Sequence, residues 1–257
     1  MAKKKKAPIK NWLFAGFGLI VLFFFLYKFT SYEEILKPVH FSYYPDFGIA
    51  LPVGFSIHGI DVSRHQENID WHAVREMNAN GISVHFAFIK ATEGISSTDK
   101  NFKKNWKEAT NSGIVCGAYH YFIATKSGKD QAKNFIKTVA LKSGNLPPVI
   151  DVEELYGANP VDMRLRMKDW LNLVEENYHI KPIIYTSADF YNQYLDGYFN
   201  EYPLWVAHYF EKEKPRVSSP WMFWQHNSTG HVNGISEKVD FNVFAGDPAA
   251  FEEILIK

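Results

Sequence analysis

From residue 56 onward the chain alternates short apolar runs with longer amphipathic stretches. Apolar runs of about five residues bounded by glycine, proline or polar clusters are typical of buried strands, and longer amphipathic stretches are typical of helices. The apolar runs occupy residues 56–62, 84–90, 115–121, 148–152, 182–186, 204–208, 222–226 and 238–241. The pattern therefore predicts eight strands.

Five amphipathic stretches between the first six runs predict helices, at residues 70–80, 99–112, 128–142, 161–178 and 188–197. Ser127 and Asn159 stand at expected N-cap positions, and Pro160 suits a first helical turn. After the sixth run the gaps are too short or too rich in turn residues for full helices. The sequence thus predicts five strand-then-helix units followed by plainer strands.

Strands that alternate with helices imply a parallel sheet with right-handed crossovers, and eight such strands can close. The predicted fold is α/β, an irregular TIM-like β/α barrel with about five β/α units and three further strands. The competing fold is a doubly wound open sheet. That fold binds nucleotides with a glycine-rich turn after its first strand, where this chain has SRHQENIDW instead.

The first thirty residues follow a different pattern. A block of lysines at 3–6 and Lys10 precede an uncharged apolar run from Trp12 to Tyr27. As a helix this run spans about 24 Å, and its extension to residue 30 approaches the roughly 30 Å of a bilayer's hydrocarbon core. We expect residues 1–11 to form a basic cytoplasmic tail and 12–30 a single helix across the lipid bilayer of the cytoplasmic membrane. The rest then lies outside the cytoplasm.

A cleaved secretory signal is the alternative interpretation, because signal peptides share the basic flank and the apolar core. Residues 28–36, KFTSYEEIL, offer no small-x-small cleavage site, which favours an uncleaved anchor. Residues 31–54 lack clear periodicity and contain three prolines. They predict a stalk that leads into a catalytic domain at 55–257.

Charge and composition narrow the functional classes. The 28 basic and 28 acidic residues balance, but the first thirty residues hold six lysines and no acid, which leaves 22 basic and 28 acidic groups in residues 31–257. This balance tells against a nucleic-acid partner held by a basic surface. The single cysteine, Cys116, permits no internal disulfide and no cysteine-based metal site. The aromatic share of 16% suits a sugar-stacking cleft as well as a large core.

In a closed parallel barrel the functional side chains collect at the carboxyl ends of the strands. Four of the eight predicted ends bring carboxylates. They are Asp61 on the first strand, Glu93 on the second, Asp151 with Glu153 on the fourth and Asp240 on the eighth. Lys90, Tyr119, Tyr121, Tyr185, His208 and Gln225 fall at the other ends or beside these acids.

The sharpest motif is PPVIDVEE at residues 147–154. Strand positions two apart project to the same face, so Asp151 and Glu153 are expected to meet in the mouth of the barrel. Crowded carboxylates cannot all ionise at their free pKa values, so one retains a proton near neutrality while its neighbour stays charged. Cleavage of a glycosidic bond needs this division of roles. We expect Glu153 to be the acid.

Spacing alone leaves two other interpretations open. A lone Asp-x-Glu at a strand end is more often a capping or solvated pair, and clustered carboxylates also bind hard cations. The chain has no Asp/Asn-Gly calcium loop and no histidine pair spaced as in HExxH. We therefore expect no metal and no cofactor.

These residues also carry a family likeness. The segments are HGIDVSRHQENIDW (58–71), FAFIKATEG (86–94), GAYHYF (117–122), LPPVIDVEE (146–154), PIIYTS (182–187), PLWVAHY (203–209), FWQHNSTGHVNGI (223–235) and VDFNVF (239–244). In this order they resemble glycoside hydrolase family 25, the Chalaropsis-type lysozymes. The resemblance implies a β/α barrel that hydrolyses the β-1,4 bond between N-acetylmuramic acid and N-acetylglucosamine in peptidoglycan glycan strands.

Residue by residue, Glu153 matches the family's proton donor, and Asp151, Asp61 and Asp240 match its other acidic positions. Asp151 is the preferred stabiliser of the transition state, with Asp61 as the fallback. Tyr119, Tyr121, Tyr185, Trp205 and Gln225 lie in matching segments, which implies sugar stacking and hydrogen bonds to N-acetyl groups. Trp205 and Tyr121 could instead belong to a core layer below the site. Glu67 departs from the glycine that often follows Gln66 in the family. The rival to an enzyme is a catalytically silent glycan-binding or scaffold domain.

Overall fold

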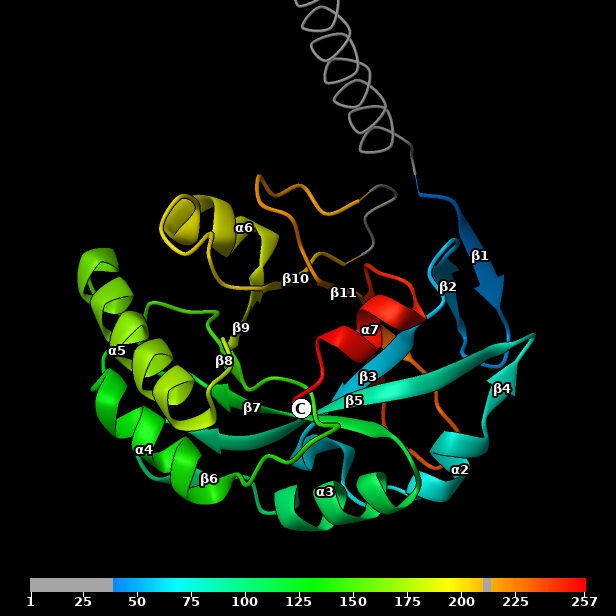
Figure 1. The fold of residues 1–257 in the computed structure, drawn as a ribbon. Coiled ribbons are helices and arrows are strands. Elements are labelled where there is room, and N and C mark those ends of the chain that lie inside the picture. The colour runs from blue at the N-terminus through cyan, green and yellow to red at the C-terminus, as the bar shows by residue number, and fades with distance from the viewer. Residues whose placement is uncertain (1–38, 210–213) are drawn as a thin grey trace, which may run out of the picture. The chain divides into compact units, whose positions relative to one another are not determined.

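Eight strands close into a barrel in the computed structural model of the protein, which describes residues 39–209 and 214–257 (Figure 1). The strands are β3 (His58–Val62), β5 (Ile82–Glu93), β7 (Val115–Tyr121), β8 (Val149–Asp151), β9 (Ile183–Ser187), β10 (Leu204–Ala207), β11 (Phe223–Gly230) and β12 (Val239–Phe244). Each predicted strand is confirmed, and pairing between β3 and β5 closes the ring.

The direction of the last strand differs from the sequence prediction. All neighbours from β3 and β5 round to β11 are parallel, but β12 runs antiparallel to both β11 and β3. Only residues 231–238 connect β11 to β12, which is too short for the crossover that a parallel pair needs. Asp240 therefore stands near the start of its strand rather than at its end, and reaches the rim from the opposite direction.

A helix is found within each of the five predicted stretches around the barrel (Figure 1), but the one expected at 70–80 ends at Glu76, and Asn78–Ala79 form a short strand instead. The helices are α2 (Trp71–Glu76), α3 (Phe102–Asn111), α4 (Gly128–Thr138), α5 (Pro160–Tyr178) and α6 (Ala188–Phe190), which continues into η2 (Tyr191–Leu195). The predicted caps hold as well. The Ser127 side chain accepts a hydrogen bond from the Asp130 amide, and that of Asn159 accepts one from Val161. Short elements η1 (Arg64–Gln66), β4 (Asn78–Ala79) and β6 (Ser97–Thr98) fill the remaining connections.

Part of the predicted stalk is structured. Strands β1 (Phe41–Tyr44) and β2 (Ile49–Pro52) form an antiparallel hairpin. Phe47 at its turn is fully buried, with its ring 5.2 Å from that of Phe241 on β12. The prolines that suggested a stalk fall where a hairpin tolerates them, because Pro45 lies in the turn and Pro52 ends a strand. The compact unit starts at His40, before the expected boundary at residue 55.

The predicted tail at 1–11, the predicted membrane helix at 12–30 and the first part of the stalk lie outside the described residues. Within residues 39–209 and 214–257, no helix combines the length and the apolar character that crossing a bilayer requires.

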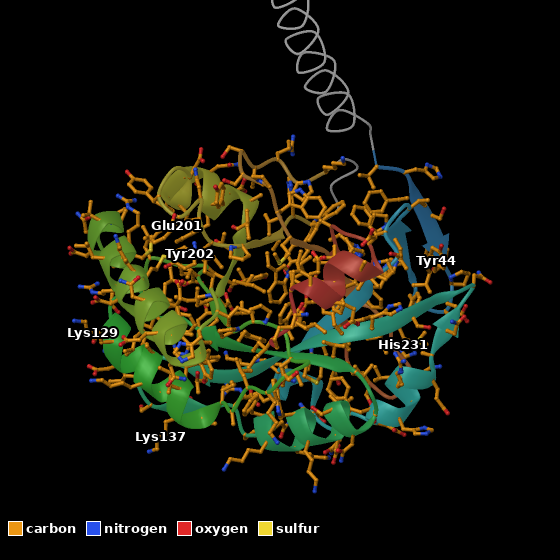
Figure 2. The ribbon with its side chains drawn as sticks, viewed as in Figure 1. Tyr44, Lys129, Lys137, Glu201, Tyr202 and His231 are labelled. Atoms are coloured by element: carbon orange, nitrogen blue, oxygen red, sulfur yellow. The ribbon has the colours of Figure 1, made fainter. Side chains whose placement is uncertain are left out.

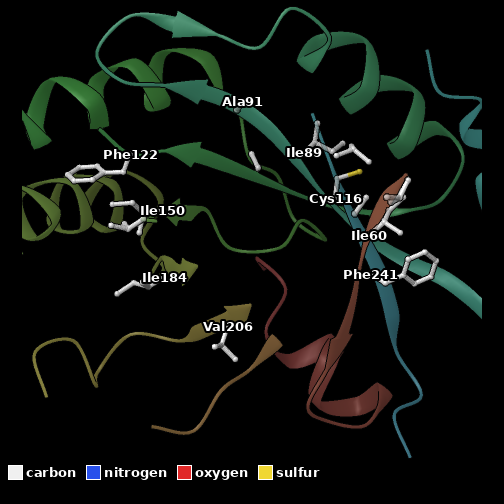
Figure 3. Close-up of a cluster of buried hydrophobic side chains, with 14 of the residues drawn as sticks. Ile60, Ile89, Ala91, Cys116, Phe122, Ile150, Ile184, Val206 and Phe241 are labelled. Carbon is white, nitrogen blue, oxygen red and sulfur yellow. The ribbon is translucent and has the colours of Figure 1, made fainter. Parts of the chain in front are cut away.

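Side chains alternate between two cores along each strand. Outward residues such as Ile60, Ile89 and Ile150 pack under the helices (Figure 3). Inward residues, among them Phe86 and Phe88, fill the barrel itself. Helix α7 (Pro248–Glu253) contributes Phe251 to this inner core, and its ring lies 5.7 Å from that of Phe86. Apolar side chains thus fill the barrel interior away from the carboxyl ends of the parallel strands. The polar inward residues of the site lie at that carboxyl-terminal rim.

Glycine at position 117 makes room for this filling. A Cβ added there would clash with the Phe88 ring and lie 3.1 Å from Leu146. We expect Gly117→Ala to lower the free energy of unfolding by about 1–3 kcal/mol through overpacking, measured by denaturant titration. Adding Phe88→Leu should recover part of the loss because the smaller side chain makes room. Equal stability of Gly117→Ala and the wild type would contradict this account of the barrel interior.

Candidate active site

One pocket of about 200 Å³ at the rim of the barrel collects the predicted site residues. It is lined by Asp61, Ser63, His65, Lys90, Tyr119, Tyr121, Asp151, Glu153, Tyr185, Trp205, Tyr209, Gln225 and Asp240. All four predicted acids and all five predicted sugar-binding residues are among them. The alternation of side chains along neighbouring strands brings them together, since each lies on an inward position near the rim.

The strand registers place the acids in two pairs. Asp61 on β3 stands directly opposite Asp240 on β12, a pairing that the antiparallel direction of β12 permits. Asp151 is the last residue of β8, and Glu153 follows two residues later on the same side of the chain. The pocket therefore brings together acids from the first and last barrel strands, β3 and β12, with acids from β8 and the residues just after it.

Asp61 is buried and held by two side-chain amides. Gln225 Nε2 and Asn242 Nδ2 both donate to Asp61 Oδ2 at 2.7 Å. The indole Nε1 of Trp205 donates in turn to Asn242 Oδ1 at 2.8 Å. These bonds fix the carboxyl group in one orientation and favour its ionised form.

The other end of the Gln225 amide is also fixed. Its Oε1 accepts hydrogen bonds from the hydroxyls of Tyr185, at 2.6 Å, and Tyr209, at 2.5 Å. The amide therefore has a single consistent orientation, with oxygen toward the tyrosines and nitrogen toward Asp61. A continuous chain of hydrogen bonds thus runs from two tyrosines on the β9 and β10 side to the Asp61 carboxylate.

Trp205 forms part of the floor of the pocket. It is 2% exposed, and its ring stacks on that of Phe88 at a centroid distance of 4.3 Å. Of the two roles considered from the sequence, the structure places Trp205 in the layer below the site. Tyr121 is different, because it is only half-buried and its hydroxyl lies 2.8 Å from that of the exposed Tyr156.

Burial raises the pKa of all four acids, and a neighbouring carboxylate raises each of them further, which for Glu153 is Glu154. Burial is the largest cause in each case. The pKa of Asp61 is raised further by Asp240 and opposed by its two amide donors, and that of Asp151 is raised further by Glu153 and opposed by Lys90. The pKa of Asp240 rises to about 6, with Glu153 as the second cause. The pocket consequently retains protons close to neutral pH.

Asp151 and Glu153 differ in access. Asp151 is 6% exposed, and its Oδ1 has no hydrogen-bond partner among the described residues. Glu153 is exposed at the mouth of the pocket, yet the protein around its carboxyl group desolvates it enough to raise its pKa, against the lowering effect of Tyr185. Glu153 can therefore meet a substrate directly, while Asp151 lies beneath it.

Lys90 supplies the positive charge of the pocket. Its Nζ lies 2.7 Å from Glu93 Oε2 and 4.5 Å from the centre of the Tyr121 ring. Lys90 thus forms an ion pair with Glu93 at the edge of the pocket. Lys90 lowers the pKa of both Asp151 and Glu153, which partly offsets the repulsion between them.

The histidines near the strand ends form structural hydrogen bonds. His120 is fully buried, and its ring bonds to Thr92 at 2.7 Å and to Gln131 at 3.3 Å, while burial lowers its pKa to about 3. His58 donates from Nε2 to the Phe55 carbonyl at 3.0 Å, and burial lowers its pKa to about 4. Neither lines the pocket.

Sequence reasoning missed several members of the site. Ser63, His65 and Tyr209 line the pocket, and Asn242 orients Asp61 from behind. Asn242 could have been found, because it lies two residues beyond Asp240 and therefore faces the same way along β12. Within the described ranges, 39–209 and 214–257, no group of three or more histidine, cysteine or acidic side chains is arranged to hold a metal ion.

A β/α barrel with a pocket of carboxyl groups at its rim is an arrangement suited to a glycosidase. Comparison with known proteins places this chain within that class. The family model described as "Glycosyl hydrolases family 25" matches residues 60–235. The chain belongs to this family.

Two relatives show the extent of the sequence similarity. The chain is 46% identical over 221 residues to the Escherichia coli K12 protein YegX, described as uncharacterized, and the match covers 85% of this chain and 81% of YegX. It is 36% identical over 213 residues to Lysozyme M1 of Streptomyces globisporus, covering 75% of this chain and 69% of that enzyme.

The family 25 glycosyl hydrolase from Bacillus anthracis superposes with a TM-score of 0.73 at 30% identity, over 85% of this chain and 97% of that one. The bacterial lysozyme from Streptomyces coelicolor gives 0.69 at 33% identity, over 77% and 96%.

Proposed function

We infer that this glycosidase hydrolyses peptidoglycan, as a lysozyme of family 25. One observation of the site carries the inference. Four carboxyl groups with raised pKa values converge on a single pocket, and one of them, Glu153, is open to the substrate. The relatives described as lysozymes support the substrate class. A glycan-binding domain without activity would have no use for an accessible carboxyl group whose pKa is raised by burial.

We propose that the scissile bond is the β-1,4 link between N-acetylmuramic acid and N-acetylglucosamine. Protonated Glu153 gives its proton to the glycosidic oxygen as the bond to C1 breaks. The positive charge that develops at the sugar ring is stabilised by the negative charge of the pocket. Water then supplies the hydroxyl at C1, and its proton returns to Glu153.

Asp151 is our preferred partner for that charge. Its buried Oδ1 has no donor among the described residues, so this oxygen is available to an N–H or O–H group of the bound sugar. Asp61, the fallback, has one oxygen engaged by two amides and faces Asp240. In this scheme the charges of Asp61 and Asp240 chiefly set the electrostatic potential around Glu153 and Asp151. Glu153 transfers the proton, and Asp151 stabilises the developing positive charge.

Mass spectrometry of purified peptidoglycan after digestion tests the proposal. We expect new reducing ends on N-acetylmuramic acid. New ends on N-acetylglucosamine would assign the enzyme to a different bond. Binding of glycan fragments by the wild type without any new reducing ends would support the silent scaffold instead.

We also propose that residues 12–30 anchor the enzyme in the cytoplasmic membrane, with the catalytic domain outside. The lysine block before this segment and the missing cleavage site after it support the proposal. A reporter that is active only after export, fused behind Lys257, should be active in cells. Activity of a reporter that works only in the cytoplasm would reverse the orientation, and a mature protein starting near residue 30 would show that the segment is cleaved.

A further inference from the structure

Positive charge is concentrated in one part of the domain. Residues 100–142 contain nine lysines and two acidic residues, Glu108 and Asp130. The other positions within 31–257 contain 13 basic and 26 acidic residues. A strongly basic segment is thus set in a strongly acidic domain.

All nine lysines of this segment are exposed. Three lie on α3 and three on α4, with the others in the adjoining loops. They are Lys100, Lys103, Lys104, Lys107, Lys126, Lys129, Lys133, Lys137 and Lys142, and together we call them the lysine face. Helices α3 and α4 follow one another around the outside of the barrel, and Figure 2 shows Lys129 and Lys137 extending from its surface.

Little within the protein neutralises this charge. Lys133 is paired with Asp130 at 3.1 Å, and Lys104 donates to the amide oxygen of Asn68 at 2.9 Å. Among the residues that the structure describes, no other lysine of the face takes part in an ion pair. Like charges in this density repel each other, so a polyanion would be attracted to this side.

The lysine face begins next to the catalytic rim. Helices α3 and α4 come after β5 and β7, whose carboxyl ends form part of that rim, and each helix runs from the rim down the side of the barrel. At the start of α3, the Asn101 side chain donates to the Glu67 carbonyl in the loop that follows Asp61 on β3. Lys100 and Lys126 precede these helices in the loops that leave β5 and β7, so they belong to the rim side of the lysine face.

We propose that the lysine face binds the carboxylates of the peptide stems of peptidoglycan, as a second contact with the same polymer that the pocket cleaves. The proposal rests on the proposed function. The stems repeat along each glycan strand and carry free carboxyl groups, so a row of lysines can engage several at once. Many weak contacts of this kind add up to firm but salt-sensitive binding. The acidic remainder of the domain repels the same stems, which orients the enzyme with this side toward the wall.

Charge reversal tests the proposal. The full-length variant Lys103→Glu, Lys107→Glu, Lys137→Glu is compared with a control, Lys168→Glu, Lys181→Glu, Lys257→Glu, which changes the net charge equally at exposed sites elsewhere. Binding to insoluble peptidoglycan is measured by co-sedimentation at low and high salt. We expect the first variant to bind at least about 10-fold more weakly at low salt and to lose most of the salt dependence, while the control retains both.

Two further measurements identify the ligand. Peptidoglycan whose stem carboxylates have been converted to amides should bind the wild type as weakly as intact peptidoglycan binds the variant. Turnover on this amidated peptidoglycan should be the same for wild type and variant. Equal binding of intact peptidoglycan by both proteins would overturn the proposal, as would wild-type binding that does not depend on the stem carboxylates.

Binding to vesicles of anionic phospholipid that the charge reversal abolishes, with no effect on peptidoglycan, would assign the face to a membrane and also overturn the proposal. Failure of the proposed function is detected independently. If the protein does not hydrolyse peptidoglycan, no new reducing ends appear in the wild-type digest, whatever the binding assay shows.

Discussion

Replacing Glu153 with glutamine is expected to lower turnover on peptidoglycan by about 10²- to 10⁴-fold, the usual contribution of general acid catalysis. Glutamine keeps the size of the side chain but cannot donate the proton that the leaving oxygen needs. Glu153 is exposed, so its replacement leaves the core untouched. The measurement is the initial rate of reducing-end release, together with the thermal unfolding midpoint of both proteins.

Glu154→Gln is the matched control, because Glu154 is the next residue, is also exposed and does not line the pocket. We expect it to retain turnover within a small factor of the wild type. Wild-type rates in the Glu153 variant, or equal losses in both variants, would remove Glu153 from its assigned role.

Asp240→Asn is expected to make the protein more stable at neutral pH and less active. Burial and the nearby Glu153 raise the pKa of Asp240 from 3.8 to about 6, so its ionisation opposes folding. Asparagine fills the same space without ionising. At about 1.4 kcal/mol per pKa unit, the variant should gain about 1–3 kcal/mol in the free energy of unfolding at pH 7.

The pH dependence of that gain follows from the direction of the shift. Below pH 4 both states of the wild type hold the proton on Asp240, so the two proteins should be equally stable. Between pH 4 and 6 only the unfolded state releases the proton, and the advantage of Asp240→Asn should grow until it levels off above pH 6. Denaturant titrations across this range measure it. A gain that persists at pH 3.5 would point to a cause other than ionisation.

The activity of Asp240→Asn, unlike its stability, is expected to fall. Glu153 raises the pKa of Asp240, and because repulsion between two carboxylates is reciprocal, the negative charge of Asp240 helps to keep the proton on Glu153. Without that charge, Glu153 should lose its proton at lower pH, and the alkaline limb of the pH–activity profile should shift toward acid. A profile that is unchanged in shape would separate Asp240 from proton retention at Glu153.

The sequence was sufficient for the parts of the fold that local pattern determines. Apolar runs identified the eight barrel strands, and caps such as Ser127 and Asn159 fixed the starts of two helices. The alternation of side chains was enough to bring Asp151 and Glu153 into one pocket with Asp61. In each of these cases the evidence lay within a few residues along the chain.

What the sequence did not disclose depends on contacts between distant segments. The residues of the β1–β2 hairpin were interpreted as a stalk because the contact that packs them on the barrel, between Phe47 and Phe241, joins residues far apart in the sequence. The direction of β12 depends on which strands flank it. Likewise, the family resemblance implied sugar stacking for Trp205, with a core layer as the alternative, and only its bond to Asn242 and its stacking on Phe88 place it in the floor of the pocket.

The pairing of β3 with β12 has a consequence for when activity can appear. The bond from Asn242 to Asp61 joins residues 181 positions apart, and it forms only where the first and last barrel strands meet. Contacts of such long range are slow to form, because most of the intervening chain must be ordered first. A nascent or truncated chain that lacks its final strand therefore has Glu153 and Asp151 but neither Asp240 nor an anchored Asp61. We expect such a chain to be inactive, because two of the four pocket acids are missing or unsupported.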